Sequence, residues 1–440
     1  MNWIKSSYIF ISVIKDFLII FILYNNEFNK IINRPANILI ILFLIIYWLL
    51  FSYILGQYEI YYKELKNKLL SNIVNTLLVL ITSNIIYITI NLITDQISFN
   101  VINIYLFINI TSKISLCILI FQSIIDTIVQ KNFLKKNKWV VISKEKNFTQ
   151  LIETNSSFKS NFEFIKLTDY DHKIDCKEIK GLIIDPSIKY EYKKLNIFKQ
   201  IKKSNLEILN ILNWYEKYLQ ISPNNQNSLS LLIDVQSRLN FKSINYRIKR
   251  IGDIFFSLLL LITLAPLIVI IILFLFFLEG NPIFYSQVRT GLNSKYIKII
   301  KFRTMVVNAE INGPQWSRKD DKRVTYIGKL LRKFRLDELP QLLNVIKGEM
   351  SLIGPRPERP EFDKELRKKI TNYSFRYSVK PGLSGWAQVN YHYSSNIKDA
   401  INKLNYDIYY IKHQSIFLDL IILFKTIKII FFARGWASKF

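Results

Sequence analysis

The chain has 440 residues, half of them hydrophobic, and a formal net charge of +27. Hydrophobic residues form long blocks with lysines and arginines between them, which is typical of a membrane protein and not of a soluble one. The richness in Ile, Asn and Lys inflates the charge, and no zinc-type or helix-turn-helix motif supports nucleic-acid binding. Cys117 and Cys176 form no disulfide framework, which fits soluble parts in a reducing cytoplasm.

Four apolar stretches come first, at residues 8–24, 36–55, 69–93 and 99–125. Each is about long enough to cross a hydrocarbon layer of ~30 Å as a helix. The first is the weakest, because it contains Lys15 and Asp16. Lysines cluster at residues 63–68 and 131–138 but not near Asp95, which predicts that both ends of this bundle face the cytoplasm. Lys30 and Arg34 oppose that orientation. The first apolar run has no small-residue cleavage site, so we expect it to be retained.

We expect the four-helix transmembrane bundle to occupy residues 1–125 and a basic linker to occupy residues 126–138. From Trp139 the pattern changes to short β-type runs: WVVIS, FEFIKL, GLIIDP and LEILNIL, with helix-like segments such as residues 190–203 between them. This alternation predicts parallel strands and crossovers, a Rossmann-like α/β domain at residues 139–237. Residues 143–146 read SKEK where a dinucleotide-binding domain has its glycine-rich turn, so we expect no nucleotide cofactor there.

A hydrophobic run follows at about residues 253–278 and is interrupted by Pro266. Basic residues flank it on both sides: Lys242, Arg247, Lys249 and Arg250 before it, and Arg289, Lys295 and Lys298 after it. A spanning helix would put one basic flank outside, so the sequence favours a re-entrant or in-plane helix that breaks at Pro266. Two later apolar helices, at residues 397–410 and 415–432, carry Asp407, Asp419, Lys425 and Lys428. They could pack in a core, span the membrane or lie along its surface, and the charges favour a position at the membrane interface.

The stretch at residues 328–360 contains two adjacent carboxylates, Asp337 and Glu338. Basic residues surround them: Arg332, Lys333 and Arg335 before, Arg356 and Arg359 after. This pattern favours phosphate chemistry, in which one carboxylate holds a divalent cation while the other attacks or accepts a proton. The alternative is structural, with Asp337 as the N-cap of a short helix. The loop Gly354-Pro355-Arg356-Pro357 favours the first interpretation, because two prolines fix the backbone around one arginine.

Four motifs in one order resemble the bacterial polyprenyl-phosphate sugar-phosphate transferases: YIKIIKFRTM, DKRVTYIG, RLDELPQLLNVIKGEMSLIGPRPE and KPGLSGWAQVNY. The resemblance covers roughly residues 240–440, and residues 238–440 are the expected catalytic domain. It implies a membrane α+β protein, with a mostly helical catalytic domain behind the bundle and the Rossmann-like domain. The family's helix break is usually Ser-Pro, whereas this chain has Ala265-Pro266.

The resemblance also implies residue roles. Asp337 would be the nucleophile and Glu338 the Mg²⁺ ligand, with Arg332 near the phosphates. The residues expected to face the UDP-sugar are Lys301, Arg303, Pro355, Arg356 and Pro357. His392 and His413 lack metal-ligand spacing, and we expect Trp386 to serve in packing.

The activity implied is transfer of a hexose-1-phosphate from a UDP-sugar to undecaprenyl phosphate, with release of UMP. This would be the first membrane step of exopolysaccharide, capsule or O-antigen assembly, on the cytoplasmic face of the bacterial inner membrane. The expected partners are both substrates and membrane lipids, with no nucleic acid, and a homo-oligomer is left open. Two alternatives are an inactive membrane scaffold or regulator and a membrane-tethered nucleic-acid binder.

Overall fold

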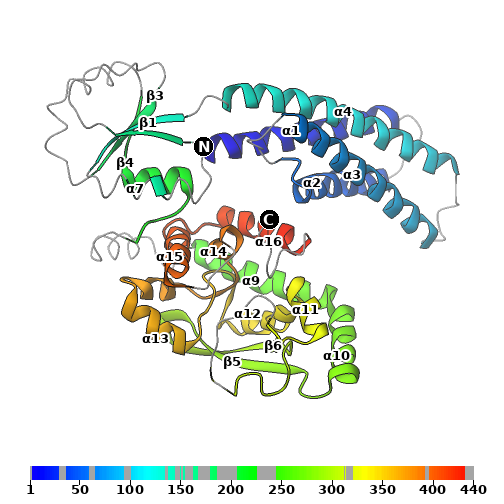
Figure 1. The fold of residues 1–440 in the computed structure, drawn as a ribbon. Helices are drawn as coiled ribbons and strands as arrows, with labels where there is room; N and C mark the ends of the chain where they lie inside the picture. The colour runs from blue at the N-terminus through cyan, green and yellow to red at the C-terminus, as the bar shows by residue number, and fades with distance from the viewer. Residues whose placement is uncertain are drawn as a thin grey trace, which may run out of the picture. The chain divides into compact units, whose positions relative to one another are not determined.

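The computed structural model divides the chain into two compact units, Met1–Leu219 and Gln220–Phe440 (Figure 1). Each unit is described by itself. The structure describes residues 2–28, 36–58, 65–93, 101–133, 137–143, 149, 152–153, 162–166, 179–185, 206–224, 244–311, 313, 321–391 and 396–431. Several features named above lie outside these residues: Cys176, His392, Lys242, residues 144–146 and the helix-like segment at residues 190–203.

The first unit begins with four helices, as the apolar stretches predict: α1 (Asn2–Phe28), α2 (Ala36–Ile54), α3 (Leu65–Ile93) and α4 (Val101–Phe133). Three of them contain stretches long and apolar enough to cross a membrane, Tyr8–Asn26, Lys68–Thr89 and Ile104–Val129. Helix α2 contributes the shorter apolar stretch Ile40–Ile54. Helix α4 continues to Phe133, so much of the predicted linker is helical.

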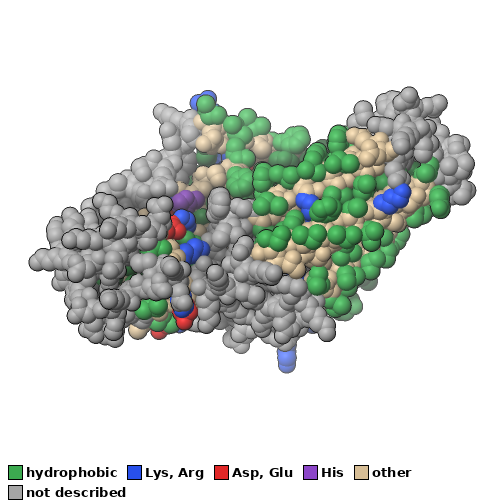
Figure 2. Space-filling view, turned by 90° about the horizontal axis from the view of Figure 1, so that it is seen from above, with side chains coloured by type: hydrophobic (Ala, Val, Ile, Leu, Met, Phe, Trp, Pro, Cys, Tyr) green, Lys and Arg blue, Asp and Glu red, His purple; other side chains and the backbone are tan. Residues whose placement is uncertain are grey.

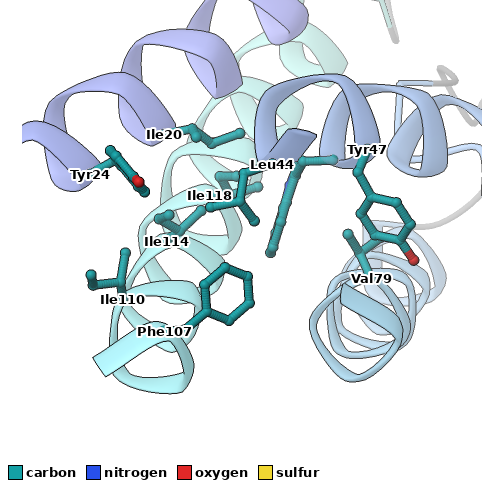
Figure 3. Packing of buried hydrophobic residues seen from close by; sticks show 10 residues of the cluster. Ile20, Tyr24, Leu44, Tyr47, Val79, Phe107, Ile110, Ile114 and Ile118 are labelled. Atoms are coloured by element: carbon teal, nitrogen blue, oxygen red, sulfur yellow. The ribbon is translucent and has the colours of Figure 1, made fainter. Parts of the chain in front are cut away.

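Large side chains from all four helices fill one core, in which Trp48, Phe107 and Ile114 are almost completely buried (Figure 3). Tyr87 of α3 stacks on Phe107 of α4, with ring centroids 3.7 Å apart. The face of the bundle seen in Figure 2 is largely hydrophobic, with few basic side chains. An apolar surface of this kind suits a lipid environment, because lipid tails replace water as the solvent.

The charges inside the first span have polar partners within the first unit. Lys15 lies 2.8 Å from the carboxylate of Asp16 and donates to Gln122 of α4 at 2.7 Å. The hydroxyl of Tyr58 donates to Asp16 at 2.5 Å. Buried charges are tolerated when they are paired and hydrogen-bonded, so these residues do not prevent α1 from lying in a bundle.

A four-stranded parallel sheet follows, with the strand order β2-β1-β3-β4. The strands are β1 (Asn137–Ile142), β2 (Phe162–Lys166), β3 (Ile179–Ile184) and β4 (Glu207–Asn210). The predicted parallel sheet is therefore confirmed. The last strand is shorter than LEILNIL suggests, because the side chain of Asn210 accepts from the N–H of Asn213 and starts helix α7 (Ile211–Trp214). Helix η3 (Tyr215–Leu219) follows directly.

The second unit begins with a helical hairpin, α9 (Ile244–Thr263) and α10 (Ala265–Glu279), whose axes differ by 61°. The break falls at Leu264, and Pro266 lies in the first turn of α10, where its missing N–H costs no helical hydrogen bond. The predicted break at Pro266 is thus present. The first helix starts at Ile244, nine residues before the hydrophobic run expected from the sequence.

The polar N-terminal half of α9 is bonded to other elements of the second unit. Lys249 pairs with Asp419 at 2.8 Å, and Arg250 donates to the carbonyls of Val345 and Ile346 at 2.7 and 2.8 Å. Asp253 accepts from the N–H of Leu352 at 3.1 Å. Two of the basic residues assigned to the membrane flank therefore hold α9 on the second unit, which weakens the charge argument for its topology.

The body of this unit has two small sheets. Strands β5 (Phe284–Thr290) and β6 (Tyr296–Phe302) form an antiparallel hairpin, around η4 (Leu292–Ser294), and β7 (Ser351–Ile353) pairs in parallel with β8 (Gly382–Ser384). Between the two sheets the chain forms α11 (Tyr326–Lys333), η5 (Leu336–Gln341) and α12 (Leu342–Lys347). Helices dominate the unit, as expected.

The remaining helices are α13 (Pro360–Lys369), η6 (Tyr373–Ser378), α14 (Trp386–Asn390), α15 (Ile397–Lys412) and α16 (Ile416–Phe431). The predicted interfacial position of residues 397–410 is wrong, because Leu404, Asp407 and Tyr410 of α15 are only 1% exposed. Trp386 is 2% exposed, which confirms its role in packing. Helix α16 keeps exposed apolar side chains such as Phe417.

Candidate active site

The two adjacent carboxylates lie on η5, whose sequence Leu-Asp-Glu-Leu places a leucine on either side of the acids, and these leucines pack against the α9–α10 hairpin. Leu336 and Leu339 pack against a buried cluster formed by Ile271, Leu275, Phe302 and Leu331. Because Ile271 and Leu275 belong to α10, the apolar side of η5 rests on the hairpin. The two acids between the leucines are thereby held beside the hairpin.

Local backbone geometry separates η5 from the helices around it. Arg335 adopts a left-handed conformation, with φ 55°, directly after α11 ends. Helix α12 begins only at Leu342, after Gln341. Asp337 lies inside the turn and is not an N-cap of α12, so the structural alternative for this residue is wrong.

Glu338 is surrounded by cations from three parts of the unit. Its Oε1 lies 2.6 Å from Nη2 of Arg356 and 3.4 Å from Nζ of Lys301, and its Oε2 lies 3.7 Å from Nη1 of Arg335. Burial alone would raise the pKa of Glu338, but these positive charges hold it well below its usual range. Glu338 is therefore ionised at any physiological pH.

Asp337 has a different environment, although it is the neighbouring residue. It is 8% exposed, and within the described part of the chain its carboxylate forms no hydrogen bond or ion pair. Burial, and then the negative charge of Glu338, raise the pKa of Asp337 to about 6, although the positive charges of Lys301, Arg332 and Arg356 lower it. Asp337 is thus ionised near neutral pH without being committed to a partner, which is the state required of a nucleophile.

Arg332 and Arg303, two basic residues expected near the substrate, have different hydrogen-bond partners. Arg332 donates from Nε to Oγ1 of Thr304 at 2.8 Å, and its positive charge opposes the rise in the pKa of Asp337, while its predicted place near the phosphates stays a prediction. Arg303 instead donates to the carbonyls of Glu279 and Gly280 at 2.7 and 2.8 Å. Its guanidinium closes the C-terminal end of α10, where free carbonyls attract cations.

The loop Gly354-Pro355-Arg356-Pro357 carries Arg356 to Glu338. A Cβ on Gly354 would lie 2.5 Å from the carbonyl of Lys380, so only glycine permits the close approach to the start of β8. The side chain of Arg356 remains 35% exposed while it contacts Glu338. Pro355 and Pro357 shape the loop backbone, and Arg356 is the loop side chain that reaches the acid pair.

Two further basic residues near the site were not predicted as site residues. Arg335 contributes to the cations around Glu338. Arg289 of β5 donates from Nη1 to the carbonyl of Pro357 at 3.2 Å and interacts electrostatically with Arg356 and Glu338. The sequence offered Arg335 only as part of a basic stretch and Arg289 only as a membrane flank, since strand pairing brings Arg289 to the loop.

Glu338 is the carboxylate of this site that could hold a Mg²⁺ ion together with a substrate. Oε1 of Glu338 contacts Arg356 and Lys301, whereas Oε2 has, among the described residues, the single ion-pair partner Arg335 at 3.7 Å. Mg²⁺ in phosphoryl-transfer sites is commonly held by one or two carboxylates together with substrate phosphates. The described residues contain no group of three potential protein ligands, so such an ion would need phosphate oxygens as further ligands.

Comparison with known proteins decides the family. The family model described as bacterial sugar transferase matches residues 244–433, which contain the whole of this site. The Exopolysaccharide production protein ExoY of Sinorhizobium fredii is 38% identical over 202 residues, which are 42% of this chain and 87% of that protein. The chain belongs to the bacterial sugar transferase family.

Longer relatives of this transferase family also match. A UDP-N-acetylgalactosamine-undecaprenyl-phosphate N-acetylgalactosaminephosphotransferase of Aeromonas hydrophila is 42% identical over 43% of this chain and 44% of its own length. A UDP-glucose:undecaprenyl-phosphate glucose-1-phosphate transferase of Klebsiella pneumoniae is 33% identical over 60% of this chain and 57% of its own length. The chain thus spans about half the length of these relatives.

Proposed function

We propose that this protein is a phosphotransferase that moves a hexose-1-phosphate from a UDP-sugar to undecaprenyl phosphate and releases UMP. The observation that carries the proposal is the contrast between two neighbouring acids: Asp337 is uncommitted within the described residues, whereas Glu338 is held by Arg356, Lys301 and Arg335. Relatives of the family named above transfer sugar phosphates to undecaprenyl phosphate.

In the first half of the reaction, a carboxylate oxygen of Asp337 attacks the β-phosphorus of the UDP-sugar. The bond between that phosphorus and the bridging oxygen breaks, UMP leaves with the electron pair, and the sugar phosphate stays on Asp337 as an acyl phosphate. Arg356 and Lys301 neutralise charge on the phosphate oxygens. Mg²⁺, held by Glu338 and the diphosphate, would supply further neutralisation of the leaving group.

In the second half, a phosphate oxygen of undecaprenyl phosphate attacks the same phosphorus. The bond to Asp337 breaks and the carboxylate is restored, so the enzyme returns to its starting state. The lipid substrate is in the bilayer and the nucleotide sugar is in water. The packing of η5 on α10 supports a meeting of both at Asp337, because it keeps the acid pair close to the apolar hairpin.

We place the reaction on the cytoplasmic face of the inner membrane, with α9 and α10 as a re-entrant hairpin. Helix α10 has 15 residues, about 22 Å of helix, which is enough for one leaflet and too short for a bilayer of ~30 Å. The 61° bend at Leu264 is compatible with a re-entrant chain in which both helices are tilted in the membrane, and equally with a broken span. The pathway served would be exopolysaccharide, capsule or O-antigen assembly.

The direct test is a panel of UDP-sugars with undecaprenyl phosphate and Mg²⁺ in detergent, scored by release of UMP. UDP-N-acetylgalactosamine, UDP-glucose and UDP-galactose form the core of the panel. Turnover of one sugar that depends on the lipid phosphate would support the proposal. Silence across the whole panel would favour the inactive scaffold, and salt-sensitive DNA binding without sugar transfer would favour a nucleic-acid binder.

A further inference from the structure

The backbone of the loop at residues 355–358 is held by donors from three elements of the second unit, namely β5, η6 and β8. Each of four consecutive carbonyls accepts one: Pro355 from the N–H of Gly382 at 2.9 Å, Arg356 from Nη2 of Arg376 at 2.9 Å, Pro357 from Nη1 of Arg289 at 3.2 Å, and Glu358 from the N–H of Thr290 at 2.8 Å. Since prolines have no N–H, the carbonyls are the main means of fixing this loop.

The donor to the backbone carbonyl of Arg356 is the buried side chain of Arg376. Arg376 is 5% exposed, and the same Nη2 lies 3.0 Å from Oδ2 of Asp407, which is 1% exposed. Arg376 also donates to the hydroxyl of Tyr373 and lies 3.7 Å from Glu358. A buried guanidinium needs this compensation, because an unpaired charge in the interior is costly.

We propose that Arg376 and Asp407 form a positioning pair that holds the backbone of Arg356, so that the guanidinium of Arg356 meets the diphosphate of the nucleotide sugar. The inference rests on the proposed function. Arg376 fixes the carbonyl of Arg356, and Asp407 fixes Arg376. A charge-assisted hydrogen bond is shorter and stronger than a neutral one, which suits a contact that must keep its geometry.

The pair acts through Arg356 and not on the substrate. Within the described residues, the hydrogen bonds and ion pairs of Arg376 involve Tyr373, Arg356, Glu358 and Asp407, and none involves Asp337 or Glu338. Loss of the pair should therefore change how the nucleotide sugar is bound without removing the nucleophile. A small displacement of a substrate-positioning group has large effects on rate.

The experiment compares Michaelis constants for the two substrates in purified full-length variants. The double variant Arg376→Met with Asp407→Leu removes both charges of the pair together, so neither Arg376 nor Asp407 is left buried without the other and the protein should fold. We expect KM for the UDP-sugar that the wild type turns over to rise at least about tenfold, and KM for undecaprenyl phosphate to stay within about twofold. Arg376→Lys should give an intermediate rise, because one ammonium cannot replace the whole fork.

Arg250→Lys is the matched control, since Arg250 also donates to two backbone carbonyls, at Val345 and Ile346, but does not bond to the loop at residues 355–358. It should lower the melting temperature with both KM values unchanged. If Arg376 had only a structural role, its variants would contain a smaller fraction of active enzyme, and KM for both substrates would equal the wild-type values. Wild-type KM for the UDP-sugar in the folded double variant, or in Arg376→Lys if the double variant does not fold, would overturn the inference. If Arg356→Ala also kept normal turnover, the proposed role of Arg356 would fail instead.

Discussion

Nη2 of Arg356 lies 2.6 Å from Oε1 of Glu338, so the arginine proposed to receive the donor diphosphate is paired with the acid proposed to hold Mg²⁺. Both partners lose solvation in this pair, and each is kept charged by the other. A bound diphosphate would have to share Arg356 with Glu338 or draw it away. On the proposed function, binding of the diphosphate would replace the ion pair between Arg356 and Glu338 by one between Arg356 and the substrate.

Replacing Asp337 by asparagine should abolish transfer and make the protein more stable. The fold raises the pKa of Asp337 from 3.8 to about 6, so the stability linked to this group is present below pH 3.8 and is lost as the pH rises through about 6. Two pKa units correspond to at most about 3 kcal/mol. We expect a higher melting temperature for Asp337→Asn at pH 7.5 and no difference at pH 4. A lower melting temperature at pH 7.5, or retained turnover, would contradict the assignment.

Replacing Glu338 by glutamine should have the opposite effect on stability. The fold holds the pKa of Glu338 below its usual range, so its contribution is present above pH 4.5 and is lost as the pH falls. The variant leaves Arg356, Lys301 and Arg335 without their counter-charge. We expect a lower melting temperature at pH 7.5 and a loss of turnover of at least about 100-fold. Equal melting temperatures of the Gln variant and the wild type would argue against the ion-pair cluster.

The rate of UMP release should be greatest between pH 6 and pH 8. Protonation of Asp337, whose pKa is about 6, removes the nucleophile as the pH falls. Burial lowers the pKa of Lys301 to about 8, although the carboxylate of Glu338 opposes this, so the ammonium charge is lost at higher pH. The measurement is kcat/KM against pH for wild type and Lys301→Arg. Because arginine keeps its charge, the variant should lose the alkaline limb, and an unchanged alkaline limb would remove Lys301 from this role.

Both ends of the α9 and α10 hairpin should be accessible from the cytoplasm. Asn245 and Lys295 are exposed and lie on either side of the hairpin, so cysteines at these positions avoid the buried contacts of Lys249. We expect labelling of both by an impermeant thiol reagent only in inverted vesicles or broken cells. The control background is Cys117→Ser with Cys176→Ser. Labelling of Lys295→Cys in intact cells would mean that the hairpin crosses the membrane.

The sequence alone determined the features that depend on local order along the chain. Apolar length gave the bundle helices, and the alternation of short β-type runs gave the parallel sheet, because each pattern reports one element at a time. Pro266 predicted the helix break for the same local reason. The adjacent acids and the Gly-Pro-Arg-Pro loop indicated the site, since both are short motifs whose chemistry is carried by neighbouring residues.

Only the tertiary structure decided which charges meet. The two acids are adjacent in sequence, yet Glu338 forms ion pairs with Arg356, Lys301 and Arg335, whereas Asp337 forms an ion pair with none of these three. Strand pairing and the position of the loop determine which cations reach each acid. Charge counts could not show that Lys249 serves an internal contact or that Arg303 closes α10. Asp407 looked like an interfacial charge on an apolar helix, and burial against Arg376 makes it part of the core. A charged side chain is solvated or buried according to what packs over it, and residues distant in sequence supply that packing.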